Sequence, residues 1–318
     1  MLKDFKIGNY TDAENGTGAT VIICEKGAVG GVSVKGASPA TRETDLLKSE
    51  KTVEMLNAVV LSGGSAFGLE ASSGVTKYLS EIGAGFKAGK FIVPIVSGAS
   101  LFDLEFKNFA YPNVQNGYDT AKNAVSGNFE FGNIGAGTGA TISKVLGAET
   151  SAKGGLGVKT FKLNNLEIAV FVAVNAVGDI VKNGEILSGA KHENGEFLDS
   201  SKVFTLGATA VTPSNTTIGA IITNAKLTKV QANILAELSH NGLALSLSPC
   251  HTAFDGDAMF VMASGETDFE FNALTALIPN LVAEAIQSVA LQAETHTQKR
   301  VNPVVLKLFK KVFAKAKK

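Results

Sequence analysis

Short apolar runs recur along this sequence, and turn residues lie close to most of their ends. They span residues 18–24, 29–34, 53–61, 166–175 and 216–223. Runs of this length, rich in β-branched residues and closed by turn residues, are typical of buried β-strands. The chain has 34 glycines but only 7 prolines, which indicates many tight turns in a folded protein. The sequence therefore predicts a core built around β-sheet.

Helical patterns alternate with these strands. Residues 66–82 follow a glycine turn and carry an apolar stripe with helical spacing. Thr228 and Gln231 match a capping box at the start of a second helix, which Gly242 is expected to end. Residues 271–293 predict one kinked helix or two, because a proline interrupts them. Strands that alternate with helices favour a layered α/β fold, and the 318 residues suit a single large domain.

The charge balance limits the partners of the chain. Lys and Arg together number 29, as do Asp and Glu, so no net field favours nucleic acid or an acidic membrane surface. No apolar stretch is expected to cross a bilayer, and residues 1–10 lack the apolar run of a secretory signal. We therefore expect a cytoplasmic protein with a small substrate. Cys24 and Cys250 lie far apart and are expected to be free thiols.

Two glycine-rich turns suggest sites for chemistry. Ser65 follows a predicted strand and precedes a helix, as in the nucleophile elbow of α/β-hydrolases. That motif needs glycine two residues after the serine, where this chain has Phe67, so a packing turn is the better interpretation. The run 135–139 fits neither the GxGxxG motif nor a P-loop. A turn that approaches an active site is the better interpretation of it, and Lys144 is the nearest titratable side chain.

The histidines show no spacing that predicts a metal site, so we expect no metal and no cofactor. Asp255 and Asp257 flank a glycine in what is by default a polar turn. Thr216 and Thr217 start an apolar run and would ordinarily fill a sheet. From these residues alone, a structural role remains the simpler interpretation of both segments.

Six motifs in a fixed order carry a more specific signal. The sequence resembles the L-aminopeptidase/D-esterase and β-peptidyl aminopeptidase family, which is related to nylon-oligomer hydrolases and ornithine acetyltransferases. The motifs are TRETDLL at 41–47, LSGGSAFGL at 61–69, GAGTGAT at 135–141, VNAVGD at 174–179, NTTIG at 215–219 and HTAFDGD at 251–257. For Arg42, Glu43 and Asp45 in the first motif we expect a buried ion-pair network.

The resemblance implies a fold and a processing event. It implies a four-layer αββα sandwich, with two mixed β-sheets between helix layers, as in ornithine acetyltransferases. It also implies a precursor that cuts itself between Asn215 and Thr216 into an α chain, residues 1–215, and a β chain, residues 216–318. Because Thr217 is also a threonine, a cut displaced by one residue is an alternative.

Roles for individual residues follow from the same resemblance. Thr216 would be the N-terminal nucleophile, because its freed α-amino group, with an ordinary pKa of about 8, can accept the proton of its own hydroxyl. Asn175 matches the asparagine that stabilises the oxyanion. Lys144 would orient the nucleophile or lower its pKa, and Asp255 and Asp257 would hold the Thr216 ammonium or hydroxyl. We also expect the three glycines of the GAGTGAT motif to contact substrate; they are Gly135, Gly137 and Gly139.

The expected function is that of a self-processing amidohydrolase or aminopeptidase acting on small peptide or amino-acyl amide substrates. Three alternatives remain: an acyltransferase of the ornithine acetyltransferase type, a serine hydrolase using Ser65, and a non-catalytic binding scaffold. Relatives imply a homo-oligomer, by resemblance a tetramer. The basic stretch 299–318 has an amphipathic pattern and is expected to be a docked surface helix or a terminal tail.

Overall fold

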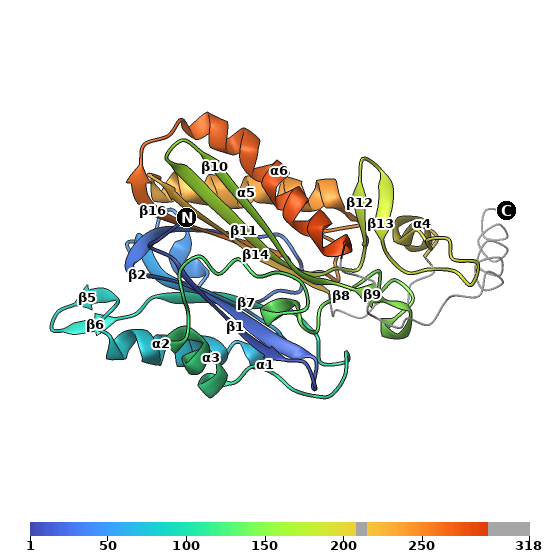
Figure 1. The fold of residues 1–318 in the computed structure, drawn as a ribbon, viewed down its shortest axis with the longest axis horizontal. Coiled ribbons are helices and arrows are strands. Elements are labelled where there is room, and N and C mark those ends of the chain that lie inside the picture. Colours follow the sequence, from blue (N-terminus) through green and yellow to red (C-terminus); the bar gives the residue numbers. More distant parts are fainter. Residues whose placement is uncertain (208–214, 292–318) are drawn as a thin grey trace.

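The computed structural model describes residues 1–207 and 215–291. Two layers of β-sheet lie between two layers of helices (Figure 1). Helices α5 (Lys229–Ser246) and α6 (Phe271–Ala290) cover one outer face, and α2 (Ala71–Glu81) and α3 (Val114–Lys122) cover the other. This arrangement confirms the αββα prediction. The predicted basic helix or tail at 299–318 lies outside the described residues.

Both sheet layers belong to one continuous hydrogen-bonded sheet of nine strands. Its order is β10 (Gly155–Leu163), β11 (Leu166–Asn175), β14 (Thr216–Ala225), β16 (Ala258–Thr267), β2 (Thr17–Val34), β4 (Met55–Ser62), β7 (Val96–Ser100) and β3 (Ala40–Arg42), with β1 (Lys6–Asp12) paired to β2. The sheet is mixed, because β14 pairs with β16 and β4 pairs with β7 in parallel, whereas the other pairs are antiparallel.

The 18-residue strand β2 joins the two layers. Its first part, up to Ile23, pairs with β1 and β4, and its last part, from Val29, pairs with β16. The register against β4 shifts between Ile23 and Ala28. A long strand with an interrupted register can change direction and serve two layers. The two predicted sheets are therefore two halves of a single sheet.

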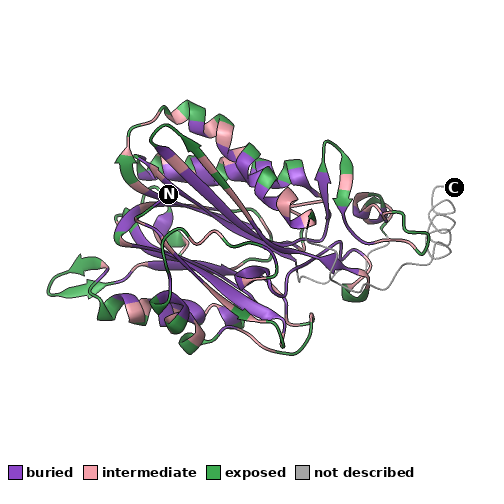
Figure 2. Ribbon diagram, viewed as in Figure 1, coloured by how far each residue is buried: buried purple, intermediate pink, exposed green. Residues whose placement is uncertain are grey.

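Strand β11 shows why the central runs are apolar on both faces. Its Ala169, Phe171 and Ala173 belong to the core between the two sheet layers. The alternate residues Val170 and Val172 belong to the core beneath α5 and α6. Successive side chains of a strand point to opposite faces, so a strand covered on both sides needs an unbroken apolar sequence. The buried strands between partly exposed helices are visible in Figure 2.

The helices agree with the sequence in type but less well in extent. The capping box of Thr228 and Gln231 is present at the start of α5. The predicted end at Gly242 is wrong, because α5 continues to Ser246 and Gly242 packs against α6, where a side chain would meet Pro279 O at 2.5 Å. Pro279 lies inside α6, which is one helix. The predicted helix 66–82 is divided into α1 (Ser65–Gly68) and α2.

The expectation that no apolar stretch is long enough to cross a bilayer is wrong for helix α6. By length and composition alone, its 20 residues would suffice to cross a bilayer. Its inner side, however, includes Ile278, Val282 and Ile286, which are buried in the core beneath α5 and α6. Packing in a core accounts for the apolar sequence of this helix.

Smaller elements surround the main sheet. They are the pairs β5 (Phe86–Ala88) with β6 (Phe91–Val93) and β8 (Thr141–Ile142) with β9 (Ala152–Lys153), the three-stranded sheet of β12 (Asp179–Lys182), β13 (Glu185–Ser188) and β15 (Leu247–Ser248), and helix α4 (Ser200–Thr205). The buried ion-pair network predicted for Arg42, Glu43 and Asp45 is wrong. Asp45 is exposed and pairs with Lys48, and Arg42 donates to Ser73 Oγ at 2.7 Å.

Candidate active site

Three segments meet at one edge of the main sheet. Asn175 ends β11 and lies directly opposite Thr216, the first residue of the antiparallel strand β14. Strand β16 is parallel to β14, so the turn that precedes it, residues 255–257, reaches the same edge. The sheet topology therefore brings together residues that are far apart in the sequence. Side chains of directly opposed residues project from the same face of a sheet, so Asn175 and Thr216 are neighbours.

The side chain of Asn175 is held from several directions. Its Oδ1 accepts hydrogen bonds from Lys144 Nζ at 2.8 Å and from the Thr141 backbone N–H at 3.0 Å. Its Nδ2 donates to Phe102 O at 3.1 Å. These contacts fix the amide orientation, with nitrogen and oxygen distinguished by their partners. The bond to Phe102 uses one of the two N–H donors of this amide nitrogen.

Lys144 is buried rather than solvated, with only 7% of its surface exposed. Burial lowers the pKa of its amine to about 7, although the nearby negative charges of Asp255, Asp103 and Glu105 favour the proton. Removal from water disfavours a charged ammonium, which explains the direction of the change. At neutral pH the amine is thus available both as a proton acceptor and as a proton donor.

The peptide bond between Asn215 and Thr216 lies in a defined environment. Thr216 Oγ1 donates to the carbonyl oxygen of Asn215 at 2.5 Å. The backbone N–H of Gly256 donates to the same oxygen at 2.9 Å. The nucleophile proposed from the sequence therefore lies beside the carbonyl that it would attack. A donor already faces the oxygen on which negative charge would develop.

The two aspartates lie on either side of this bond and are almost fully buried. Asp257 Oδ1 accepts the backbone N–H of Thr217 at 2.7 Å. Asp255 Oδ2 accepts the N–H and hydroxyl of Thr252 at 2.8 and 2.7 Å. Burial, and then the charge of Asp257, raise the pKa of Asp255 to about 6. The pair thus places negative charge close to Thr216, where a cationic group would be stabilised.

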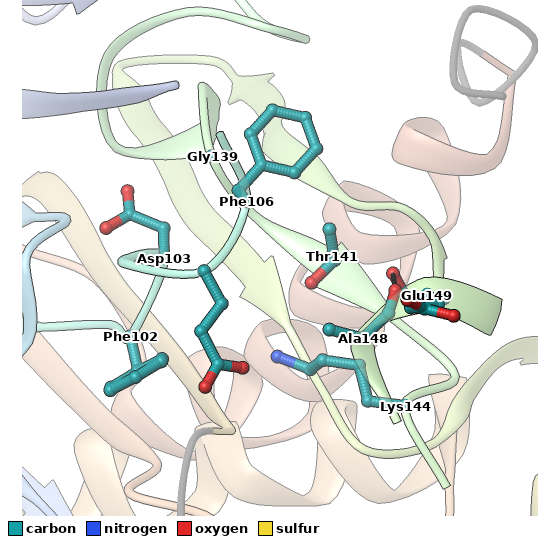
Figure 3. A pocket seen from close by; sticks show the side chains of 10 residues that line it. Phe102, Asp103, Phe106, Gly139, Thr141, Lys144, Ala148 and Glu149 are labelled. Atoms are coloured by element: carbon teal, nitrogen blue, oxygen red, sulfur yellow. Dashed lines mark hydrogen bonds between the residues drawn. The ribbon is translucent and has the colours of Figure 1, made fainter. Parts of the chain in front are cut away.

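A cleft of about 320 Å³ opens beside Lys144. Its walls include Phe102 and Phe106, the carboxylates Asp103 and Glu105, and Thr141. In Figure 3 the labelled side chains of Phe102, Phe106, Thr141 and Lys144 surround this space. The cleft is large enough for a small ligand and combines apolar and negatively charged walls.

The three glycines predicted to contact substrate differ in position. Gly139 lines the cleft, where a side chain would meet Asp103 Oδ2 at 2.6 Å. At Gly135 a side chain would meet Thr20 Oγ1 at 2.2 Å, and at Gly137 it would meet Leu156 N at 2.0 Å. Close packing explains the absence of a side chain at Gly135 and Gly137. Their contact with substrate stays a prediction.

The competing nucleophile Ser65 has little support. Its backbone adopts a left-handed conformation (φ 52°) at the first residue of α1, but its hydroxyl makes no hydrogen bond within residues 1–207 and 215–291. A serine nucleophile needs a base within hydrogen-bond reach. Across the same ranges, no three His, Cys, Asp or Glu side chains are grouped so as to hold a metal ion.

Sequence reasoning missed two contributors to the site. The first is the backbone N–H of Gly256, whose only sequence signal is its place between the two aspartates. The second is His251, whose Nδ1 lies 2.7 Å from Asp257 Oδ2. Both contacts depend on the path of a turn, which a motif does not specify.

If the Asn215–Thr216 bond is cut as the family resemblance implies, replacing Gly256 by alanine should slow that cleavage by roughly 10- to 1000-fold. A Cβ atom there would lie 2.5 Å from Ser38 O and 2.8 Å from Thr216 Oγ1, so the turn or the hydroxyl must shift. Gly265→Ala is the control, because that position has open space around a Cβ atom, although its own φ of 81° is unfavourable for alanine. Time courses of fragment formation on gels would measure the effect. Equal rates for both variants would contradict it.

The sequence is similar to those of known peptidases and hydrolases. The sequence profile of peptidase family S58 matches residues 3–306. An uncharacterized aminopeptidase of Mycobacterium leprae is 33% identical over 290 residues, which cover 84% of this chain and 78% of that protein. A 6-aminohexanoate-oligomer endohydrolase of Paenarthrobacter ureafaciens is 31% identical over 273 residues, covering 82% of this chain and 73% of that enzyme.

The fold has a solved counterpart. The L-aminopeptidase D-Ala-esterase/amidase of Ochrobactrum anthropi, described as a variant of the Ntn hydrolase fold, superposes with a TM-score of 0.69. The match covers 98% of this chain and 92% of that one at 15% sequence identity. At this identity the likeness concerns the fold alone.

Proposed function

The chain belongs to peptidase family S58, and from this premise we propose that it is a self-processing amidohydrolase whose mature nucleophile is Thr216. It is a hydrolase of the aminopeptidase type, as its family and relatives indicate, and not a non-catalytic scaffold. The observation that carries the proposal is the Asn215 carbonyl oxygen, which accepts both Thr216 Oγ1 and the Gly256 N–H.

In the first step the Thr216 hydroxyl attacks the Asn215 carbonyl carbon, and its proton passes to a base. Lys144 is our candidate, because its pKa is about 7 and its Nζ contacts Asn175, which lies opposite Thr216. The oxyanion that forms is stabilised by the Gly256 N–H. When the C–N bond breaks, the Thr216 nitrogen takes up a proton and an ester remains. Water hydrolyses this ester, leaving a carboxylate on Asn215 and a free amine on Thr216.

In the second stage the mature enzyme turns over substrate. The freed Thr216 amine, with an ordinary pKa of about 8, accepts the proton of its own hydroxyl as that hydroxyl attacks an amide. The amine product leaves, and water then hydrolyses the acyl-enzyme ester. Each tetrahedral oxyanion receives a hydrogen bond from the side-chain amide of Asn175. Loss of one such donor typically costs about 3 to 4 kcal/mol.

The walls of the cleft suggest the class of substrate. Its volume, about 320 Å³, suits one or a few residues rather than a folded protein. Phe102 and Phe106 offer apolar contact, and the carboxylate of Glu105 favours a cation. A small peptide or amino-acyl amide with a free amino group meets both conditions. No cofactor enters this scheme, and we propose that the enzyme acts in the cytoplasm as a homo-oligomer.

A denaturing gel of the purified protein tests the proposal. Two fragments are expected, near residues 1–215 and 216–318, and amidase activity should appear as they form. Mixing in a serine- and threonine-reactive inhibitor should label the smaller fragment alone. A chain that stays intact and hydrolyses amino-acyl amides at full rate would overturn the proposal.

A further inference from the structure

His251 takes no part in the mechanism above, yet it contacts that site directly. Its Nδ1 lies 2.7 Å from Asp257 Oδ2, and the imidazole is partly exposed whereas the carboxylate is buried. A carboxylate oxygen only accepts hydrogen bonds, so Nδ1 carries a proton and donates it. The left-handed backbone of His251 (φ 54°) directs the ring back toward its own turn. A rare conformation of this kind is maintained only where surrounding contacts hold it.

Asp257 connects His251 to the backbone beside the proposed nucleophile. Its other oxygen, Oδ1, accepts the backbone N–H of Thr217 at 2.7 Å. The Thr217 nitrogen is bonded to the carbonyl carbon of Thr216, so holding it positions Thr216 as well. Before cleavage Thr216 is also tethered through Asn215. Once that bond is cut, the tether is lost and the contact with Asp257 becomes more important.

A second histidine supports the ring from the other side. His240 of α5 is buried and packs edge-on against His251, with ring centroids 4.9 Å apart. Its Nε2 lies 3.1 Å from Ser33 O, so Nε2 carries the proton. Burial lowers the pKa of His240 to about 4, which leaves this ring neutral at cellular pH. The ring of His251 is thus fixed by a neutral neighbour and is the one that can carry charge.

We propose that His251 is a positioning residue of the mature enzyme, which fixes the Asp257 carboxylate so that it holds the Thr217 backbone and aims the Thr216 amine and hydroxyl. This inference rests on the function proposed above. It assigns a role to the first residue of the HTAFDGD motif. The role is exerted through Asp257, and His251 itself does not touch the reacting atoms.

The charges in this turn predict a pH effect that a purely structural role of His251 would not produce. Burial lowers the pKa of His251, but the hydrogen bond and charge of Asp257 outweigh it, so this pKa lies above its usual value. The charged groups that face the two rings are Asp255, Asp257 and, from α5, Glu237. The positive charge of His251 offsets the negative charge of Asp257, which otherwise raises the pKa of Asp255. Without the imidazolium, Asp255 should keep its proton to higher pH.

Two substitutions separate positioning from packing. In His251→Ala the donor is lost, and kcat should fall roughly 10- to 100-fold with little change in KM, because misplaced reacting groups slow the chemical step. In His251→Asn an amide can donate from nearly the position of Nδ1 but does not titrate. This variant should recover most of kcat at pH 8. The acid limb of its kcat/KM profile, which reports the Thr216 amine, should move up by roughly 0.5 to 1 pH unit, because loss of a nearby positive charge favours the protonated amine.

A control variant and two control measurements separate the possible outcomes. His192→Asn replaces a histidine of the loop after β13 and should leave the pH profile unchanged. Melting temperatures and the extent of self-cleavage identify variants that fail to fold or mature. A mature His251→Ala enzyme with wild-type kcat, or a loss that His251→Asn does not repair and that is equal at every pH, would overturn the inference. Thr216→Ala tests the proposed function separately: if that variant still cleaves itself, the failure lies with the function and not with His251.

Discussion

Thr216→Ala should remain a single uncut chain and should lose hydrolysis of amino-acyl amides by roughly 10⁴-fold or more. The substitution removes the hydroxyl that contacts the Asn215 carbonyl oxygen at 2.5 Å. It also prevents release of the amine that serves as base in the mature enzyme, so both stages fail together. Gel analysis after prolonged incubation and a sensitive amidase assay would measure the two losses.

Thr217→Val is the matched control for this experiment. Thr217 is buried next to Thr216, and within the described chain its hydroxyl has no hydrogen-bond partner, so valine should replace it with little disturbance. The cut should then occur normally. If Thr217→Val blocks cleavage and Thr216→Ala does not, the nucleophile is Thr217 and the bond cut lies one residue further along.

Lys144→Met should slow cleavage of the precursor by about 10²- to 10⁴-fold, the usual contribution of a positioned base. In the wild type the rate should rise as pH increases through about 7, because the neutral amine is the form that accepts a proton and the pKa of Lys144 is about 7. Methionine matches the length and apolar stem of lysine but cannot titrate. The rise near pH 7 should therefore disappear. Rates of fragment formation between pH 5.5 and 9 would show it.

Lys153 supplies a control with the same charge and burial. Burial also lowers the pKa of its amine to about 7, but its Nζ donates to the backbone carbonyls of Gly137 and Ala140, each at 2.8 Å. Its role is to hold the glycine-rich loop. Lys153→Met should weaken substrate binding or lower the stability of the fold. The cleavage rate of this variant should still rise near pH 7. A rise that survives in Lys144→Met and vanishes in Lys153→Met would reverse the assignment.

The sequence predicts best what local patterns determine. The unbroken apolar runs at residues 166–175 and 216–223 reflect strands covered on both faces, and both strands are present with almost the predicted bounds. The ends of helices were harder to predict. Gly242 is a strong helix-ending signal by itself, but the close approach of α6 requires a glycine inside α5. Contacts between distant elements decide such positions, and local propensity does not record them.

The same distinction applies to the site. The resemblance selected Thr216, Asn175 and Lys144. The sheet topology brings Asn175 and Thr216 to one edge, and Lys144 Nζ contacts Asn175 Oδ1 there. Burial of Lys144 could not be foreseen from its neighbours in sequence, since an isolated lysine is usually solvated. The Gly256 N–H depends on how a turn approaches another strand. Geometry of this kind is set by tertiary packing, which single-sequence patterns do not contain.

The N-terminal sequence of the smaller fragment tests the central claim most directly. Chemical sequencing or mass analysis of the purified, aged protein should give Thr-Thr-Ile-Gly-Ala, starting at Thr216, in a molar amount equal to that of the larger fragment. An active preparation in which only the original N-terminus is found would contradict the account, and so would a fragment starting at a residue without a hydroxyl group.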